Sequence, residues 1–320
     1  MLTRKAILNL EKKIIKINYP IEKVGFFIAI LKVLMYNYKK SKGITKMTFD
    51  VELVGKIGSM ALIDTKYNML DYTLIARLSS ELKPGYVWVT SGAVEAGRLD
   101  YIKRTGSELS GEPEDVKTDY SAQGQSVLMA TYRQYIDSKY SLRQVLVEHQ
   151  HFNDEKKREH LKQMLLRSIS QGAIPIINYN DAISTEESRR VEIQSLKSKT
   201  DKVVECVDND ETAAQIACLV NAKRLLILTS ADGIYKDPDD KSTLIEEING
   251  KDRYELLDNI TACENYCHGA SRKGANGAKA KLEYIKDAAA KGTEVIIASA
   301  KYSIKDILSG EARATRIRIR

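Results

Sequence analysis

Four apolar segments of the 320-residue chain end in glycines and polar side chains that could handle a phosphate group. These ends are Lys56-Ile57-Gly58-Ser59, Thr90-Ser91-Gly92, Asn178-Tyr179-Asn180-Asp181 and residues 229–233. A lysine there supplies a point charge for a phosphate, and a glycine lets the backbone approach a ligand closely. If the segments are parallel strands, their carboxyl ends lie along one edge of a sheet, so the clusters indicate one site.

The segment 87–97 is the centre of this prediction. Its apolar start predicts a strand, Gly92 a turn, and residues 93–101 a helix. The first N–H groups of a helix lack partners within the helix, and its dipole is positive at that end, so an anion can bind there. A second segment, 273–281, brings lysines into the first turns of another predicted helix, where cations are unfavourable unless an anion is bound.

Each of these features also has an ordinary structural explanation. Lys56 could be a solvated surface lysine, and Asn180 and Asp181 could form an Asx turn after a strand. An acid of Asp208-Asn209-Asp210 could cap the helix that follows it. Even so, lysines, glycine turns and an aspartate are suitable parts for phosphoryl transfer, which needs cations and N–H groups around the migrating group.

Common nucleotide and metal motifs are missing. Residues 92–97 have the glycine spacing of a Walker A loop, but Arg98-Leu99 follows where Lys-Ser/Thr is required. No G-x-G-x-x-G follows a strand, and the four histidines form no metal-binding pattern. Cys263-x-x-x-Cys267-His268 has no second pair at zinc spacing, so we expect loop or partly buried thiols and predict no protein metal site.

The positive charge of the chain is concentrated in residues 1–46, which hold eleven Lys or Arg and two Glu although the whole chain has a net charge of only +7. We therefore expect no nucleic-acid binding by the rest of the chain. The apolar spacing of residues 1–46 predicts a basic helical extension that packs on the body or a partner subunit, or alternatively lies on an anionic membrane.

Cysteine content and hydropathy indicate a cytoplasmic protein. The four cysteines form no disulfide framework, which favours a reducing compartment. The apolar run 24–31 is shorter than the roughly 20 residues that a membrane-spanning helix needs, so no transmembrane segment is predicted.

Strand and helix patterns alternate after the extension. The predicted strands are 51–57, 87–89, 144–147, 173–177, 225–228 and 294–298, and the main helices are 68–82, 93–101, 122–138, 154–170, 210–220 and 275–290. A loop is predicted over 105–116, and an excursion or flexible hairpin over 184–204. Mostly continuous apolar strands indicate an α/β fold whose mainly parallel sheet is covered on both faces, forming one domain over 47–320.

Seven fragments, in chain order, resemble the amino acid kinase family. They are Lys56-Ile-Gly58-Ser59, Val89-Thr90-Ser91-Gly92-Ala93-x-x-Ala96-Gly97, Ala122-Gln-Gly124-Gln125, Ile176-Ile-Asn178-x-Asn180-Asp181-Ala182, Asp208-Asn209-Asp210, Leu228-Thr229-x-x-Asp232-Gly233-x-Tyr235-x-x-Pro238 and Gly277-x-x-x-Lys281-Leu282. The resemblance spans about residues 50–310 and implies a three-layer αβα sandwich. It is greatest to the members that use ATP and Mg²⁺ to phosphorylate the side-chain carboxylate of L-glutamate to glutamyl 5-phosphate, in proline biosynthesis.

The resemblance also implies a role for each matching residue. Lys56 and Lys281 would neutralise the phosphoryl group in flight, and Asp181 would hold both lysines. The acceptor would contact Ser91, Gly92, Ala93, Asn180 and, as a substitute for a family aspartate, Asp154. ATP would contact Lys56, Gly58, Ser59, Thr229, Ser230, Asp232, Tyr235, Ala275, Asn276, Gly277, Ala278, Lys279, Ala280 and Lys281. We expect ATP and a small carboxylate as partners, and a homo-oligomer.

Some positions depart from the family pattern. Tyr179 replaces a glutamate, His151 or Phe152 lies near the position of an aspartate, and Ser230 replaces an aspartate. The glycine loop is altered to Gly274-Ala-Asn-Gly277-Ala278. Three hypotheses therefore remain: a glutamate kinase, a kinase of this fold for another small carboxylate or phosphate acceptor, and a non-catalytic nucleotide-binding regulatory protein.

Overall fold

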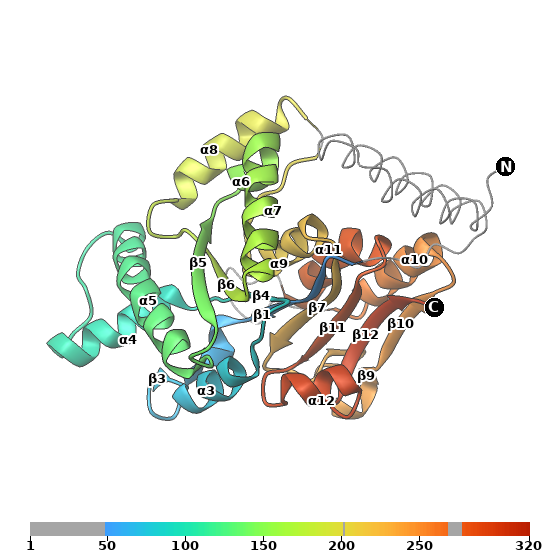
Figure 1. Cartoon of the computed structure of the whole chain (residues 1–320), viewed down its shortest axis with the longest axis horizontal. Helices are drawn as coiled ribbons and strands as arrows, with labels where there is room; N and C mark the ends of the chain where they lie inside the picture. The colour runs from blue at the N-terminus through green and yellow to red at the C-terminus, as the bar shows by residue number, and fades with distance from the viewer. Residues whose placement is uncertain (1–48, 201, 268–276) are drawn as a thin grey trace, which may run out of the picture. The chain divides into compact units, whose positions relative to one another are not determined.

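The computed structural model describes residues 49–200, 202–267 and 277–320, so the predicted basic extension lies outside the described residues. Within them, one eight-stranded sheet has the order β10-β12-β11-β7-β1-β4-β6-β5 (Figure 1). Its strands are β1 (Val51–Ile57), β4 (Tyr86–Val89), β5 (Ser141–Val147), β6 (Ala173–Tyr179), β7 (Ala222–Thr229), β10 (Glu247–Gly250), β11 (Glu294–Ser299) and β12 (Ala314–Ile319). Only β11 and β12 pair antiparallel, so the prediction of a mainly parallel sheet is confirmed.

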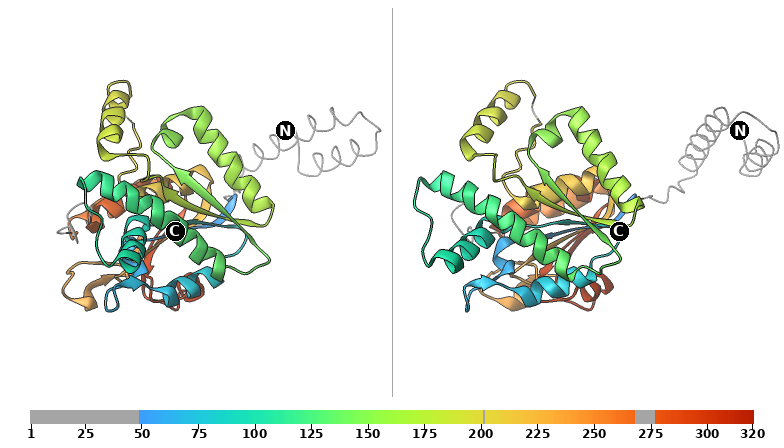
Figure 2. Two further views of the ribbon diagram at one scale, coloured as in Figure 1. Left: turned by 90° about the vertical axis from the view of Figure 1, so that its left-hand side faces the viewer. Right: turned by 60° about the vertical axis from the view of Figure 1, so that its left-hand side comes forward.

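Helices cover both faces of this sheet (Figure 2). One layer contains α7 (Glu155–Ser170), α9 (Asn209–Leu219), α10 (Arg253–Glu264) and α11 (Gly277–Ala290), and its side chains share an apolar cluster with Val54 and Leu225. The other contains α3 (Tyr72–Glu81), α4 (Ala93–Thr105), α5 (Pro113–Tyr135) and α12 (Ile304–Ser309), which pack with Leu53 and Trp88. The architecture is a three-layer αβα sandwich.

Strand alternation decides which helix layer the lysine of β1 faces. Leu53 and Ile57 belong to the cluster with α3 and α5, whereas Val54 belongs to the cluster with α9. Because successive side chains of a strand point to opposite faces, Lys56 shares the face of Val54. Its side chain is buried, with 5% of its surface exposed, and a buried ammonium group needs a counter-charge from the helices above it.

Two segments predicted to be irregular are helical in part, so those predictions hold only over residues 106–112, 184–185, 198–200 and 202–204. The predicted loop over 105–116 already contains the start of α5, because Pro113 is well suited to the first turn of a helix and Glu114 and Asp115 follow it there. Residues 184–204 contain α8 (Glu186–Lys197), whose N-cap Thr185 accepts a hydrogen bond from the Ser188 N–H at 3.3 Å. Figure 2 shows α8 standing away from the sandwich.

The remaining elements are short. They are η1 (Ser59–Leu62), β2 (Ile63–Asp64), β3 (Met69–Leu70), α6 (Gln150–Asn153), β8 (Ile234–Tyr235), η2 (Lys241–Thr243) and β9 (Leu244–Ile245). Cys263 lies in α10 and, like Cys267, is partly buried, whereas His268 lies outside the described residues. In the part of the chain that the structure describes, no helix is both long enough and apolar enough to cross a bilayer.

Candidate active site

Lys56 and Lys281 converge on a single carboxylate. The Nζ atom of Lys56 lies 2.6 Å from Asp210 Oδ1, and that of Lys281 lies 2.5 Å from Asp210 Oδ2. Lys56 comes from β1, Lys281 from the first turns of α11, and Asp210 from the first turn of α9. The two cations that the sequence analysis selected are therefore held side by side.

Asp210, not Asp181, is the residue that holds the lysines, so the expected partner was wrong. Asp210 is fully buried. Burial by itself raises the pKa of this carboxyl group, but Lys56 and Lys281 outweigh burial and hold the pKa below its usual value. Burial likewise opposes the charge on Lys281, but Asp210 raises the pKa of that ammonium group above its usual value.

The N-terminus of α9 is set by Asp208, whose Oδ1 atom accepts a hydrogen bond from the Asp210 N–H at 2.8 Å. This is a helix N-cap, the ordinary role that the sequence analysis left open for one acid of the Asp208-Asn209-Asp210 segment. Once Asp208 caps the helix, the next two side chains begin the first turn. Asn209 faces the cavity described below, and Asp210 faces the sheet and both lysines.

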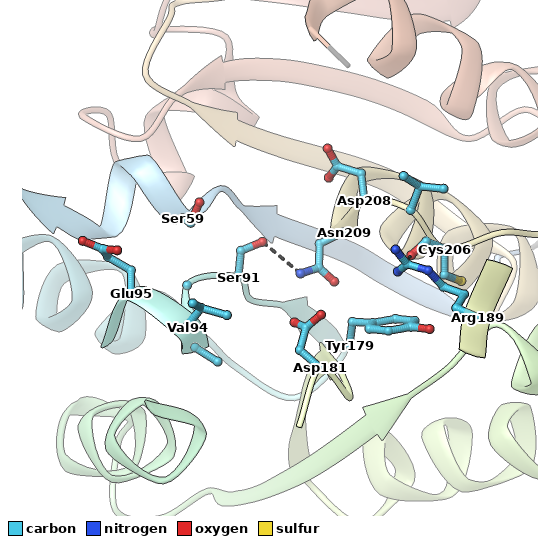
Figure 3. Close-up of a pocket in the computed structure, with 13 residues that line it drawn as sticks. Ser59, Ser91, Val94, Glu95, Tyr179, Asp181, Arg189, Cys206, Asp208 and Asn209 are labelled. Atoms are coloured by element: carbon cyan, nitrogen blue, oxygen red, sulfur yellow. Dashed lines mark hydrogen bonds between the residues drawn. The ribbon is translucent and has the colours of Figure 1, made fainter. Parts of the chain in front are cut away.

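A cavity of about 320 Å³ opens beside the N-termini of α4 and α9 (Figure 3). Its lining residues come from the ends of several strands and from α4, α8 and α9: Ser59, Ser91, Gly92, Ala93, Val94, Glu95, Tyr179, Asp181, Arg189, Cys206, Val207, Asp208 and Asn209. Two helix N-termini at one cavity provide backbone N–H groups and positive dipole ends for an anionic ligand. The prediction that strand-end clusters meet at one edge is confirmed for the β1, β4 and β6 ends.

Gly92 and Gly124 position the α4 end of the cavity. Gly92 has φ of +91°, a conformation that side chains with a Cβ rarely adopt, and it turns the chain from β4 into α4. At Gly124 in α5, a Cβ atom would lie 1.8 Å from the Ala93 carbonyl oxygen. Only a glycine lets α5 pack this closely against the first turn of α4.

A chain of amide and hydroxyl groups crosses the cavity floor. The Asn209 side-chain NH₂ donates to Ser91 Oγ and to Asn178 Oδ1, both at 3.1 Å, and the Asn178 NH₂ donates to Gln125 Oε1 at 2.9 Å. Asn209 Oδ1 is buried and has no hydrogen-bond partner among the described residues. That oxygen is therefore free to accept a hydrogen bond from a bound ligand.

The predicted acceptor residues separate into two groups. Ser91, Gly92 and Ala93 line the cavity, but Asn180 does not: its NH₂ donates to Glu148 Oε1 at 2.9 Å. Asp154 is exposed and caps α7 by accepting from the Lys157 N–H at 2.8 Å, so the structure contradicts its placement at the acceptor site. The helical spacing that predicted α7 also explains this aspartate, because a helix start favours such a cap.

Asp181 also lines the cavity, and its carboxylate forms no ion pair with another described residue and accepts no hydrogen bond from one. Burial raises the pKa of this carboxyl group, against the opposing effect of Lys117 and Arg189. A partly buried carboxylate without a partner is costly in the free protein, and it gains if a cationic group of a ligand binds beside it.

A scan with models of protein families now identifies the chain: the model of the amino acid kinase family matches residues 53–299. This chain belongs to the amino acid kinase family. It is similar to a glutamate 5-kinase of Clostridium perfringens, with 27% identity over 270 residues that cover 81% of this chain and 92% of that protein. It is also similar to a glutamate 5-kinase of Streptococcus suis, with 31% identity over 260 residues that cover 78% of this chain and 64% of that protein.

A solved structure supports the same fold. Carbamate kinase from Giardia lamblia bound to AMP-PNP matches with a TM-score of 0.53 and 18% identity, over 84% of this chain and 98% of that one. Members of the amino acid kinase family are ATP-using phosphotransferases, and the paired lysines of this amino acid kinase suit that chemistry.

The residues predicted to bind ATP are distributed over several elements of the fold. Ser59 lines the cavity, Thr229 is the last residue of β7, Ser230 follows that strand, and Tyr235 lies in β8. Asp232 is buried and pairs with Lys301 at 2.7 Å, so its charge is already balanced within the protein. Gly277, Ala278, Lys279 and Ala280 begin α11 together with Lys281, whereas Ala275 and Asn276 lie outside the described residues.

The sequence analysis gave no individual role to three side chains of the candidate site. Asp210 was named only as part of Asp208-Asn209-Asp210, a possible capping segment and one of the family-like fragments. Asn209 was not assigned a contact, and Arg189 lies in the segment predicted to be an irregular excursion. A helix prediction over 186–197, from its Thr185 cap and acidic first turn, would have drawn attention to Arg189.

Proposed function

We propose that this amino acid kinase transfers the γ-phosphoryl group of ATP to the side-chain carboxylate of L-glutamate, giving glutamyl 5-phosphate in the first step of proline biosynthesis. The observation that carries the proposal is the convergence of Lys56 and Lys281 on Asp210 beside the cavity. Similarity to glutamate 5-kinases, over most of the Clostridium perfringens protein, supports glutamate as the acceptor.

The reaction makes one bond and breaks one. A carboxylate oxygen of glutamate forms a bond to the γ-phosphorus, the bond from that phosphorus to the β,γ-bridging oxygen breaks, and ADP takes the electron pair. Such a transfer depends on positioning and charge stabilisation more than on covalent help from the protein. Lys56 and Lys281 neutralise the negative charge in flight, and Asp210 keeps their ammonium groups together in the absence of substrate.

The other residues divide between the two substrates. Ser91, Gly92, Ala93 and Asn209 hold the acceptor, and Asp181 faces its ammonium group. Gly58, Ser59, Thr229, Ser230 and the start of α11 hold the nucleotide. Of the altered positions, Tyr179 is the last residue of β6 and Ser230 directly follows β7.

The described residues fit Mg²⁺ that enters with the nucleotide. Among them, no group of three or more His, Cys, Asp or Glu side chains is placed to hold a metal ion. Mg²⁺ bound to a nucleotide keeps several waters and needs only one or two protein carboxylates, a requirement that Asp208 at the cavity would meet. The ion supplies charge neutralisation on the phosphates, as Lys56 and Lys281 do.

The test is a trapping assay for the acyl phosphate. Full-length protein is incubated with ATP, Mg²⁺, L-glutamate and hydroxylamine, and glutamyl hydroxamate is measured together with ADP. Hydroxamate that depends on both substrates supports the proposal. ADP release with a phosphate acceptor or another carboxylate, but no hydroxamate from glutamate, rejects glutamate while leaving a kinase. Intact ATP binding with no transfer to any acceptor indicates the non-catalytic alternative.

A further inference from the structure

Arg189 is the only cationic side chain among the described residues that line the cavity, and the proposed chemistry gives it no role so far. Its guanidinium carbon lies 5.4 Å from the centre of the Tyr179 ring, and one of its Nη1–H groups donates to the Cys206 carbonyl oxygen at 3.3 Å. Figure 3 shows Arg189 and Tyr179 together at the opposite end of the cavity from Ser59 and Glu95.

The protein holds this arginine in place from two directions. The Tyr179 ring supports one face of the planar guanidinium group by a cation–π contact. Cys206 has φ of +51°, an uncommon left-handed conformation for a residue with a side chain, and its carbonyl oxygen accepts the Arg189 hydrogen bond. Backbone strain of this kind is common at binding sites, and here it occurs at the residue whose carbonyl oxygen accepts the hydrogen bond from Arg189.

Arg189 and Asp181 have opposite charges in one cavity but form no ion pair within 4.0 Å of each other in the described part of the chain. The two lysines of the site, Lys56 and Lys281, do not line this cavity and already share Asp210. A zwitterionic ligand can therefore supply both groups with the ion pair that they lack among the described residues, with its carboxylate at Arg189 and its ammonium group at Asp181.

We infer that Arg189 binds the α-carboxylate of the amino-acid acceptor and makes α8 the element that selects an amino acid over an acceptor without that group. This inference rests on the proposed function, and it deepens it. The planar fork of a guanidinium group matches a carboxylate through two parallel hydrogen bonds, which a lysine cannot reproduce. With the α-carboxylate at Arg189, the side-chain carboxylate is left to reach the lysine pair, which Asp210 holds next to the cavity residue Asn209.

The test compares glutamate with 4-aminobutyrate, which is glutamate without its α-carboxylate. Steady-state kinetics are measured for the full-length wild type, Arg189→Gln, Arg189→Lys and the control Arg190→Gln. Arg190 is the exposed neighbour on α8, so its replacement removes the same charge outside the cavity. Circular dichroism of each variant checks that it is folded.

We expect Arg189→Gln to raise the KM for glutamate about 10- to 100-fold, the usual effect of losing hydrogen bonds between charged groups, with the KM for ATP unchanged. Arg189→Lys should recover part of this loss, and Arg190→Gln should match the wild type. The kcat/KM for 4-aminobutyrate should be low in the wild type and should not fall further in Arg189→Gln. If it is too low to measure in both proteins, the glutamate KM decides.

Two results overturn the inference while the proposed function stands. One is a KM for glutamate in Arg189→Gln within threefold of the wild-type value. The other is a loss with 4-aminobutyrate as large as the loss with glutamate, because a structural role of Arg189 would affect both acceptors equally. If the wild type makes no hydroxamate from glutamate, the proposed function fails and the inference fails with it.

Discussion

Lys56 and Lys281 bind opposite oxygens of one buried carboxylate, Oδ1 and Oδ2 of Asp210, at 2.6 and 2.5 Å. They come from the first strand of the sheet and from a helix near the end of the chain. The two lysines are therefore far apart in sequence, and only the fold brings them together. Their shared partner keeps two ammonium groups close together that would otherwise repel each other. The free protein thereby holds in advance the positive charge that phosphoryl transfer needs.

Removing either lysine should lower kcat far more than it changes the KM for glutamate. For Lys56→Ala and for Lys281→Ala we expect kcat to fall about 100- to 1,000-fold, the usual effect of deleting one group that stabilises transition-state charge. Hydroxamate formation measures this loss. Lys223→Ala, which removes an exposed lysine from β7, should retain wild-type rates. Equal kcat values for all three variants and the wild type would contradict a catalytic role for the pair.

Replacing Asp210 by asparagine should destabilise the fold in a pH-dependent way. Asp210→Asn leaves Lys56 buried without its counter-charge, which costs about 3–5 kcal/mol at pH 7. The folded pKa of Asp210 lies below the ordinary value of 3.8, so its contribution to stability is present above that value and is lost as the pH falls toward the folded pKa.

Urea unfolding of the wild type and Asp210→Asn between pH 7 and pH 3.5 measures the difference directly. Titrating groups that do not interact with Asp210 cancel in that difference. We expect it to be constant from pH 7 to about pH 5 and to shrink below about pH 4. A difference that grows on acidification would show that Asp210 is not stabilised as an anion by the lysines.

Gly124→Ala should disturb the cavity through the contact between α5 and the first turn of α4. The added Cβ would lie 1.8 Å from the Ala93 carbonyl oxygen, so α5 must move away from the first turn of α4. Overpacking of this kind costs about 1–3 kcal/mol, and it should also raise the KM for glutamate because Ala93 lines the cavity. Ser126→Ala, on the exposed side of α5, is the matched control for urea unfolding and kinetics. Wild-type behaviour of both variants would refute the close contact.

Glu192→Ala should release α8 from the sandwich. Glu192 Oε2 and the buried His149 Nε2 share a hydrogen bond at 2.7 Å, and Ile193 is the only buried residue of α8. Without Glu192, both ring nitrogens of His149 lack partners among the described residues, a cost of about 1–3 kcal/mol.

We expect faster trypsin cleavage within α8 of Glu192→Ala, identified by mass spectrometry of the fragments, and a higher KM for glutamate because Arg189 is carried by this helix. Glu187→Ala removes an exposed acid from the same helix and should cleave at the wild-type rate. If Glu192→Ala and Glu187→Ala are cleaved at the same rate, the hydrogen bond to His149 does not hold α8.

Local pattern in the sequence was enough to predict most of the sheet and to select Lys56 and Lys281. β1 was predicted with its observed bounds, because a strand that is buried on both faces is a nearly continuous apolar run. The strand-end clusters with Lys56 and Ser91 identified the edge of the sheet at which the cavity lies. β12 was missed because Arg316 and Arg318 interrupt its apolar residues. In the structure these arginines pair with Glu294 and Glu247 across neighbouring strands, partners that no local pattern reveals.

The sequence by itself determined the fold class, the family and the presence of two lysines at opposite ends of the domain, since each depends on local periodicity or a short motif. Only the tertiary structure decided that Asp210 rather than Asp181 joins those lysines, that Asp154 is an exposed cap, and that α8 brings Arg189 into the cavity. The reason is physical: a carboxylate of the same chemistry can cap a helix, bind a ligand or pair with a lysine, and only its position in three dimensions selects among these roles.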